Sequence, residues 1–155
     1  MTKKSAGILL YRKLNKTLEV FLVHPGGPFY SRKDLGTWSI PKGEYTDEDP
    51  ELAARREFFE ETGSMLAGEL MYLAETKMKS GKLISCWAVE GDFDEKNLIS
   101  NTFELEWPPR SGKMSAFPEV DKGAWFNIED AKEKIHPSQL VFLDALVTFF
   151  GSSGS

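Results

Sequence analysis

Glutamate residues near the middle of the chain recur at spacings that would bring their side chains together on a helix. Residues 41–64 read PKGEYTDEDPELAARREFFEETGS, and eight acidic residues but only two arginines fall between positions 44 and 61. Glu57, Glu60 and Glu61 are three and four positions apart, so they would share one helical face. Three adjacent carboxylates repel one another unless a cation lies among them, and Mg²⁺ prefers such oxygen ligands. The pattern is consistent with a divalent-cation site, although for these three residues alone a solvated acidic face is the simpler explanation.

The helix that must carry these carboxylates has recognisable ends. Asp49 is a favourable N-cap, Pro50 suits the first helical position, and the pattern runs to Thr62 before the helix-terminating Gly63. Leu52 and Phe59 are seven positions apart and are predicted to face the core, opposite the carboxylates. Phe58 is also interpreted as a core residue.

The order of residues from Gly43 to Ser64 resembles the Nudix box, the signature of the Nudix hydrolases. The chain has Gly43, four residues, Glu48, seven residues, and then Arg56-Glu57-Phe58-Phe59-Glu60-Glu61-Thr62-Gly63-Ser64. It departs from the family pattern twice. The family has five residues between Gly and the first Glu, and an apolar residue where this chain has Ser64. Both departures lie outside the segment between Glu48 and Gly63, whose spacing is intact.

This resemblance implies a Mg²⁺- or Mn²⁺-dependent Nudix pyrophosphohydrolase with the Nudix fold, and it assigns roles to particular residues. It implies that the metal is held by Glu57, Glu60, Glu61 and a backbone carbonyl at Lys42 or Gly43, whereas Arg56 and Glu48 orient the carboxylates. Glu119, six residues before Trp125, matches a further ligand or base found in many members, with Glu104 and Glu106 as rivals. Glu57 is the first candidate for the general base, followed by Glu61 and Glu119.

The substrate is expected to be a small nucleotide, and two loops could hold it. Residues 25–36 and 107–118 carry aromatic and basic side chains that could stack on a base or bind phosphates. The candidates are Tyr30, Arg32, Lys33, Arg110 and Phe117, together with Lys42 beside the box. WSIPKGEY is similar to the W-x-x-P-K-G opening of diadenosine polyphosphate hydrolases, which favours nucleoside or dinucleoside polyphosphates. The alternatives are RNA 5′ ends, nucleotide sugars or ADP-ribose, and a sensor that binds a nucleotide without hydrolysing it.

The remaining pattern predicts strands before and after this helix and further helices at the end of the chain. Combined with the resemblance, it predicts an α/β fold in which a mixed sheet lies between helices, an α/β/α sandwich. The expected strands are 5–11, 18–24, 38–40, 70–79, 83–89 and 124–126, and the expected further helices are 128–135 and 138–149. Turns are expected at Asn15-Lys16 and Ser80-Gly81.

Length and composition favour one domain over residues 1–150, followed by a flexible tail or expression remnant at 151–155. The net charge of −5 argues against general nucleic-acid binding. Cys86 is the only cysteine, which excludes an internal disulfide, and it is interpreted as a core residue. We find neither a signal peptide nor a membrane span and therefore expect a cytoplasmic protein; the resemblance allows a homodimer. His24 and His136 are interpreted as capping or packing residues.

Overall fold

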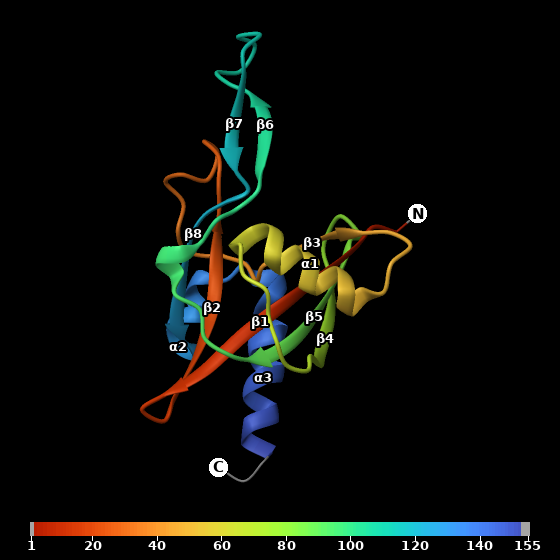
Figure 1. Ribbon diagram of the computed structural model, residues 1–155, viewed down its shortest axis with the longest axis vertical. Helices are drawn as coiled ribbons and strands as arrows, with labels where there is room; N and C mark the ends of the chain where they lie inside the picture. The colour runs from red at the N-terminus through yellow and green to blue at the C-terminus, as the bar shows by residue number, and fades with distance from the viewer. Residues whose placement is uncertain (1, 153–155) are drawn as a thin grey trace.

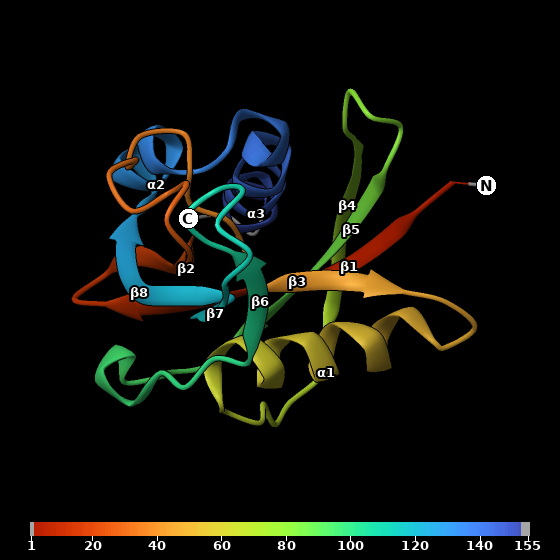
Figure 2. The ribbon, with the colours of Figure 1, turned by 90° about the horizontal axis from the view of Figure 1, so that it is seen from above.

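A computed structural model describes residues 2–152 and has three layers (Figures 1 and 2). A mixed six-stranded sheet lies between helix α1 on one face and helices α2 and α3 on the other, which confirms the predicted α/β/α sandwich. The strands of this sheet are β1 (Lys4–Leu14), β2 (Thr17–Pro25), β3 (Lys42–Tyr45), β4 (Met71–Lys77), β5 (Leu83–Glu90) and β8 (Val120–Asn127). The helices are α1 (Pro50–Thr62), α2 (Ile128–Lys134) and α3 (Leu140–Ser152), with short 3₁₀ turns η1 (Glu95–Asn97) and η2 (Pro137–Gln139).

The sheet splits beside β1. The strand order is β4-β5-β1-β2-β8, and β1 is parallel to β5 but antiparallel to β2. Strand β2 pairs with β1 only near their shared turn, whereas β3 pairs with the opposite end of β1, from Lys4 to Gly7. The segment before β3 crosses this split, since Ser39 pairs with Val23 of β2 and the Ile8 amide donates to the Pro41 carbonyl over 3.1 Å. The split therefore brings the loop before the box against the centre of the sheet.

Two apolar clusters fill the spaces on either side of the sheet. One lies under α2 and α3 and includes Cys86, which confirms its predicted place in the core. The other lies under α1 and includes Ala53, Ala54 and Phe58. Successive side chains of a strand point to opposite faces, so the sheet supplies apolar side chains to both clusters, as a sheet covered on both faces requires.

Helix α1 has the predicted ends but a different buried face. The Leu52 amide donates to the Asp49 carboxylate over 3.2 Å, and Gly63 has the left-handed φ of 80° that a helix C-cap needs. The buried residues are Ala53, Ala54, Glu57, Phe58, Glu61 and Thr62. The prediction that Leu52 and Phe59 face the core is wrong, because their side chains are 62% and 49% exposed. The helix turns its two small alanines and two of its glutamates towards β1 and β3.

A hairpin replaces much of the loop predicted at 107–118. Strands β6 (Thr102–Glu106) and β7 (Met114–Pro118) form a separate two-stranded sheet that projects from the body of the molecule (Figure 1). Prolines kept the second strand from being recognised in the sequence. The short strand predicted at 38–40 is also displaced: residues 38 and 39 make only isolated bridges, and β3 begins at Lys42.

The remaining boundaries agree with the sequence predictions in their essentials. Asn15 and Lys16 have φ values of 52° and 67°, as a tight hairpin turn between β1 and β2 requires. Helix α3 extends to Ser152, two residues into the predicted tail; the rest of that prediction, residues 153–155, lies outside the described part of the chain. Within residues 2–152, none of the helices is long and apolar enough to cross a membrane.

Candidate active site

Gly43 and Glu57 meet where β3 pairs with the N-terminal end of β1, against α1. A Cβ atom on Gly43 would lie 2.0 Å from Oε2 of Glu57, so only glycine allows the backbone to approach this carboxylate so closely. Glu57 itself is only 7% exposed. Burial raises the pKa of its carboxyl group, and the nearby Glu60 raises it further, whereas Arg56 lowers it. Gly43, the first residue of the box, therefore leaves the space that the buried Glu57 carboxylate occupies.

Arg56 holds three glutamates at once. Its Nη2 donates to Glu48 over 2.6 Å, and its Nη1 donates to Glu57 over 2.8 Å and to Glu60 over 3.3 Å. These contacts raise the pKa of the guanidinium group, with the Glu48 hydrogen bond as the largest stabilising cause. The orienting role implied for Arg56 and Glu48 has a direct geometric counterpart in these contacts.

Glu61 is buried on the same helix, next to Lys42. Glu61 is only 9% exposed, and burial raises the pKa of its carboxyl group to about 8. Glu119 and Glu57 raise this pKa further, whereas the Lys42 side chain and a hydrogen bond from the Lys42 backbone lower it. Burial in turn lowers the pKa of Lys42, while the charge of Glu61 raises it.

Glu119 reaches the site from the link between β7 and β8. Its pKa is raised by partial burial and by Glu60. The segment before β6 holds it there: the Glu119 amide donates to the Asn101 carbonyl over 2.8 Å, and the Asn101 amide donates to the Glu60 carbonyl over 2.8 Å. Asn101 thus joins the end of α1 to the start of β8, which was not apparent from the sequence because backbone pairing depends on no side-chain pattern.

The two rivals of Glu119 lie elsewhere. Glu104 and Glu106 share the exposed face of β6, as their alternation predicted. The Glu106 carboxylate accepts hydrogen bonds from the backbone amides of Arg110 and Gly112 over 3.1 and 3.2 Å. Glu106 therefore stabilises the tip of the hairpin.

A pocket of about 310 Å³ lies beside these carboxylates. We call it the carboxylate pocket; its lining includes Tyr30, Lys42, Glu61, Phe103 and Glu119. It therefore unites a lysine and two glutamates from three separate segments with two aromatic rings. Phe103 was not predicted, since a lone aromatic residue on a short strand carries no distinguishing signal.

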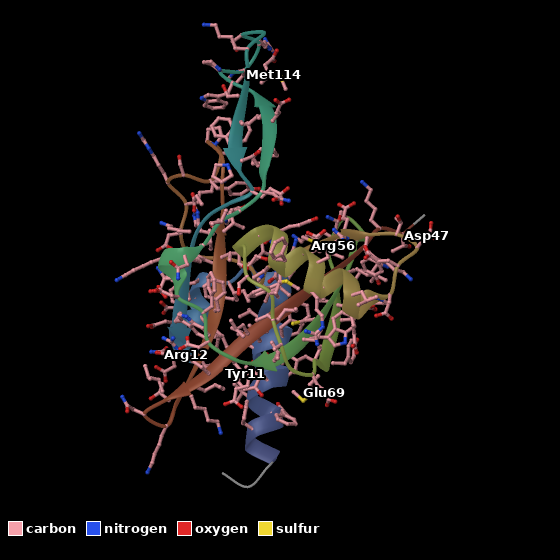
Figure 3. All side chains as sticks on the ribbon, viewed as in Figure 1. Tyr11, Arg12, Asp47, Arg56, Glu69 and Met114 are labelled. Carbon is pink, nitrogen blue, oxygen red and sulfur yellow. The ribbon has the colours of Figure 1, made fainter. Side chains whose placement is uncertain are left out.

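A second pocket, of about 400 Å³, shares Pro25, Tyr30, Ser39 and Lys42 with the first. We call it the lysine pocket; it also includes Lys33, Met78, His136 and Gln139. Three other predicted substrate residues line neither pocket. Arg32 is exposed on the loop after β2, Arg110 is at the tip of the β6–β7 hairpin, and Phe117 packs against Phe103 with ring centroids 6.1 Å apart. Figure 3 shows how far the hairpin tip, marked by Met114, lies from Arg56 on α1.

His24 fastens the loop that carries Tyr30 and Lys33. Its buried ring bonds the Asp121 carboxylate through Nδ1 over 2.9 Å and the Lys33 carbonyl through Nε2 over 2.6 Å. The loop is thereby tied to β8, close to Glu119. His136 caps η2 by accepting from the Ser138 amide, so both histidines have the packing and capping roles predicted for them.

The carboxylate oxygens of the site are suitable ligands for a hard divalent cation, but in the observed arrangement the side chains do not surround one. Among residues 2–152, no group of three His, Cys, Asp or Glu side chains is arranged to hold a metal ion. The carboxylates of Glu57 and Glu60 instead accept hydrogen bonds from Arg56. Yet the negative charges converge: after burial, Glu119 and Glu57 raise the pKa of Glu61, Glu60 and Glu119 raise that of Glu57, and Glu60 raises that of Glu119. The carboxylates would have to reorient to coordinate one ion together.

Comparisons with known proteins agree with this geometry. A family model for the NUDIX domain matches residues 1–146. No curated protein sequence matches the chain significantly. Among solved structures, an Ap4A hydrolase from C. elegans in a binary complex has a TM-score of 0.64 and 21% identity, covering 97% of this chain and 99% of the other. The NUDIX domain of NrtR from Shewanella oneidensis, crystallised with ADP ribose, has a TM-score of 0.67, 15% identity and coverages of 97% and 89%. A mutT/nudix family protein from Listeria innocua has a TM-score of 0.63, 16% identity and coverages of 97% and 95%.

The chain therefore belongs to the Nudix family, and its fold is the Nudix fold. The predicted enzyme class, a Nudix pyrophosphohydrolase, is confirmed at this level. Enzymes of this family generally use a divalent metal such as Mg²⁺ or Mn²⁺ and act on small nucleotide substrates.

Proposed function

We propose that this protein hydrolyses a diphosphate linkage in nucleoside or dinucleoside polyphosphates with the help of Mg²⁺ or Mn²⁺. One observation carries the proposal: the carboxylate pocket places Lys42 beside Glu61 and Glu119, at the point where Gly43 seats Glu57. A cationic group suited to phosphate and a carboxylate set suited to a divalent ion thus meet at one place.

Each of these residues has a part in the proposed reaction. Glu57, Glu60, Glu61 and Glu119, with the backbone at Gly43, would hold the metal. When bound, the ion supplies charge neutralisation at the diphosphate and lowers the pKa of a water molecule. Lys42 would bind a phosphate oxygen, and Tyr30 would stack on the base. Arg56 would keep the box carboxylates in position through its contacts with Glu48, Glu57 and Glu60.

Glu57 is our first candidate for the general base. It is buried, and burial and then Glu60 raise its pKa although Arg56 lowers it, so the pKa shifts towards the neutral pH at which a carboxylate base works best. Glu61 and Glu119 remain the second and third candidates, because both lie in the same pocket.

The sequence and similar structures both support a nucleoside or dinucleoside polyphosphate as the substrate. Residues 38–43 read WSIPKG, similar to the opening found in diadenosine polyphosphate hydrolases, and one similar structure is an Ap4A hydrolase. Another similar structure was determined with ADP ribose, which makes ADP-ribose hydrolysis the second candidate function. The chain retains Glu57, Glu60 and Glu61, which favours hydrolysis over a purely sensory role.

The test is a phosphate-release panel with metal-loaded protein. The panel contains nucleoside triphosphates, dinucleoside polyphosphates, ADP-ribose, nucleotide sugars and 5′-triphosphorylated RNA. Wild type is compared with Glu61→Gln and with Glu51→Gln, which changes an exposed acid in the first turn of α1. We expect cleavage of polyphosphates only with metal, a loss of about 100-fold or more in Glu61→Gln, and near-normal rates in Glu51→Gln.

Two outcomes would overturn the proposal. Cleavage of RNA ends or nucleotide sugars in preference to polyphosphates would reassign the substrate. Binding of nucleotides without cleavage of any compound, by folded and metal-loaded protein, would establish the sensor alternative.

A further inference from the structure

The lysine pocket continues the carboxylate pocket on the other side of Tyr30 and Lys42. Four residues line both pockets, so the two spaces are neighbours that share a wall. The lysine pocket lies between the loop after β2, the turn after β4 and the segment of η2, which contribute Lys33, Met78 and His136 respectively. Its volume of about 400 Å³ is within the range of pockets that hold small-molecule ligands.

The two pockets have opposite charge. Glu61 and Glu119 line the carboxylate pocket. Of the residues that the structure describes, no aspartate or glutamate lines the lysine pocket, whereas Lys33 and Lys42 both do. In a protein with a net charge of −5, a pocket with this lining is a local exception suited to an anionic ligand.

Lys42 stands at the junction of the two pockets. Its side chain is attracted chiefly by Glu61, but its ammonium group forms no salt bridge with any residue between positions 2 and 152. By contrast, the ammonium group of Lys82 forms a salt bridge with Glu44 of β3 over 2.8 Å. The Lys42 ammonium group is therefore available to a phosphate chain that passes from one pocket into the other.

The rest of the lysine pocket is unlike a site for phosphate alone. Tyr30, Met78 and His136 offer an aromatic ring, a flexible apolar side chain and an imidazole. Gln139 forms a rigid part of the wall, because its amide group is held by the Ile40 amide over 3.0 Å and by the Ser39 hydroxyl. Such a mixture of aromatic, apolar and fixed polar groups suits a base and a ribose.

We infer that the lysine pocket binds the second nucleoside of a dinucleoside polyphosphate, with the phosphate chain crossing Lys42 from the carboxylate pocket. This inference rests on the proposed function and narrows it to substrates that carry a nucleoside at each end. A mononucleoside polyphosphate fills only one of the two pockets. The substrate with two nucleosides therefore gains contacts that the mononucleoside lacks.

The test compares two substrates with the same number of phosphates, a dinucleoside tetraphosphate and a nucleoside tetraphosphate. Thr37 lines the lysine pocket but not the carboxylate pocket, so Thr37→Trp fills the former selectively. We expect Thr37→Trp to lower kcat/KM for the dinucleoside about tenfold more than for the mononucleoside, mainly through KM. Lys33→Ala should raise KM for the dinucleoside, whereas Lys113→Ala, which removes an exposed lysine of the β6–β7 hairpin, should not.

The results separate this inference from the proposed function. If Thr37→Trp lowers kcat/KM equally for both substrates, or for neither, the second-nucleoside site is refuted. The proposed hydrolase function is not affected by that result. If wild type cleaves neither compound, calorimetric titration of the metal-loaded protein with each compound tests the site. Tighter binding of the dinucleoside than of the mononucleoside, lost in Thr37→Trp, supports the site. Equal affinity for the two compounds refutes it. Selective loss of 5′-triphosphorylated RNA cleavage in Thr37→Trp would assign the pocket to RNA instead. Thermal melting verifies that each variant is folded.

Discussion

At the scale of single residues, two cations of the chain control the acidic cluster. Arg56 bonds Glu48, Glu57 and Glu60, while Lys42 lies beside Glu61. The cluster is consequently neither a solvated acidic face nor a preformed metal cage. The sequence indicated the identity of the carboxylates, but the hydrogen bonds that orient them depend on how α1 lies against β3.

Gly43 provides a test of this seating. In Gly43→Ala the new methyl group would collide with the Glu57 carboxylate, the movable end of a side chain. We expect activity to fall by about 100-fold, because displacement by roughly 1 Å is costly in an active site, with little change in the free energy of unfolding. Gly7→Ala is the matched contrast: its Cβ would lie 2.7 Å from the Pro41 carbonyl oxygen, so it should destabilise the fold. Denaturant unfolding and initial rates measure both; unchanged activity in Gly43→Ala would contradict the seating role.

Glu61 predicts a pH dependence of stability in metal-free protein. Its ordinary pKa is 4.5, and burial raises this to about 8 in the folded state. The unfolded chain therefore releases this proton at lower pH than the folded protein, so the stabilising effect is complete below about pH 4.5 and is lost as the pH rises to about 8. We expect the free energy of unfolding in a chelator to decline across this interval, and to decline less in Glu61→Gln. Glu51→Gln should keep the wild-type slope, and equal slopes in all three proteins would refute the assignment.

At the scale of elements, the sequence predicted the extent of α1 better than its orientation. The end signals at Asp49, Pro50 and Gly63 act locally, so they could be recognised without tertiary information. The buried face includes Glu57 and Glu61, which a hydrophobic pattern interprets as polar. The most apolar-looking pair, Leu52 and Phe59, was therefore assigned inward although it faces outward.

Adjacent phenylalanines test the observed orientation of α1. Phe58 is fully buried in the cluster under the helix, whereas Phe59 is 49% exposed. Phe58→Ala should lower the free energy of unfolding by about 3–5 kcal/mol, and Phe59→Ala by about 1 kcal/mol or less. Urea titration of the two variants measures the difference; similar losses would show that the helix is rotated from the position described.

The β6–β7 hairpin shows a different limit of sequence-based prediction. Its second strand is preceded by Pro108 and Pro109 and ends at Pro118, so it was interpreted as loop. The strand is stable because Phe103 and Phe117 are paired across the hairpin and Phe29 packs edge-on against Trp107 at 5.4 Å. These are contacts between residues distant in sequence, which local propensity does not encode.

At the scale of the whole molecule, the split in the sheet brings the site together. Strand β3, helix α1, the loop after β2 and the start of β8 meet where β1 and β2 diverge. The family resemblance supplied this architecture from the sequence, together with the box glutamates, Glu119 and Lys42. Phe103, Asn101 and the two adjoining pockets became evident only from the arrangement of these segments.

Metal binding should stabilise the entire fold, because α1 and β3 both contribute to the proposed site. A ligand that binds only the folded state at 100 times its Kd adds about 2.7 kcal/mol. We expect Mg²⁺ to raise the Tm of wild type, and to raise that of the double variant Glu57→Gln/Glu61→Gln much less. Scanning calorimetry with a titration of MgCl₂ measures this shift. A rise of the same size in both proteins would indicate non-specific ion binding.

The contacts of Arg56 also have a kinetic consequence. One guanidinium group against the carboxylates of Glu48, Glu57 and Glu60 leaves two of the three negative charges uncompensated. A polyphosphate approaching this place alone meets two uncompensated negative charges, whereas the same polyphosphate carrying a divalent ion does not. If the protein acts as proposed, this charge constrains the order of addition: the nucleotide would enter productively as its metal complex or after the ion, and free nucleotide in excess of metal would withhold the ion from the protein.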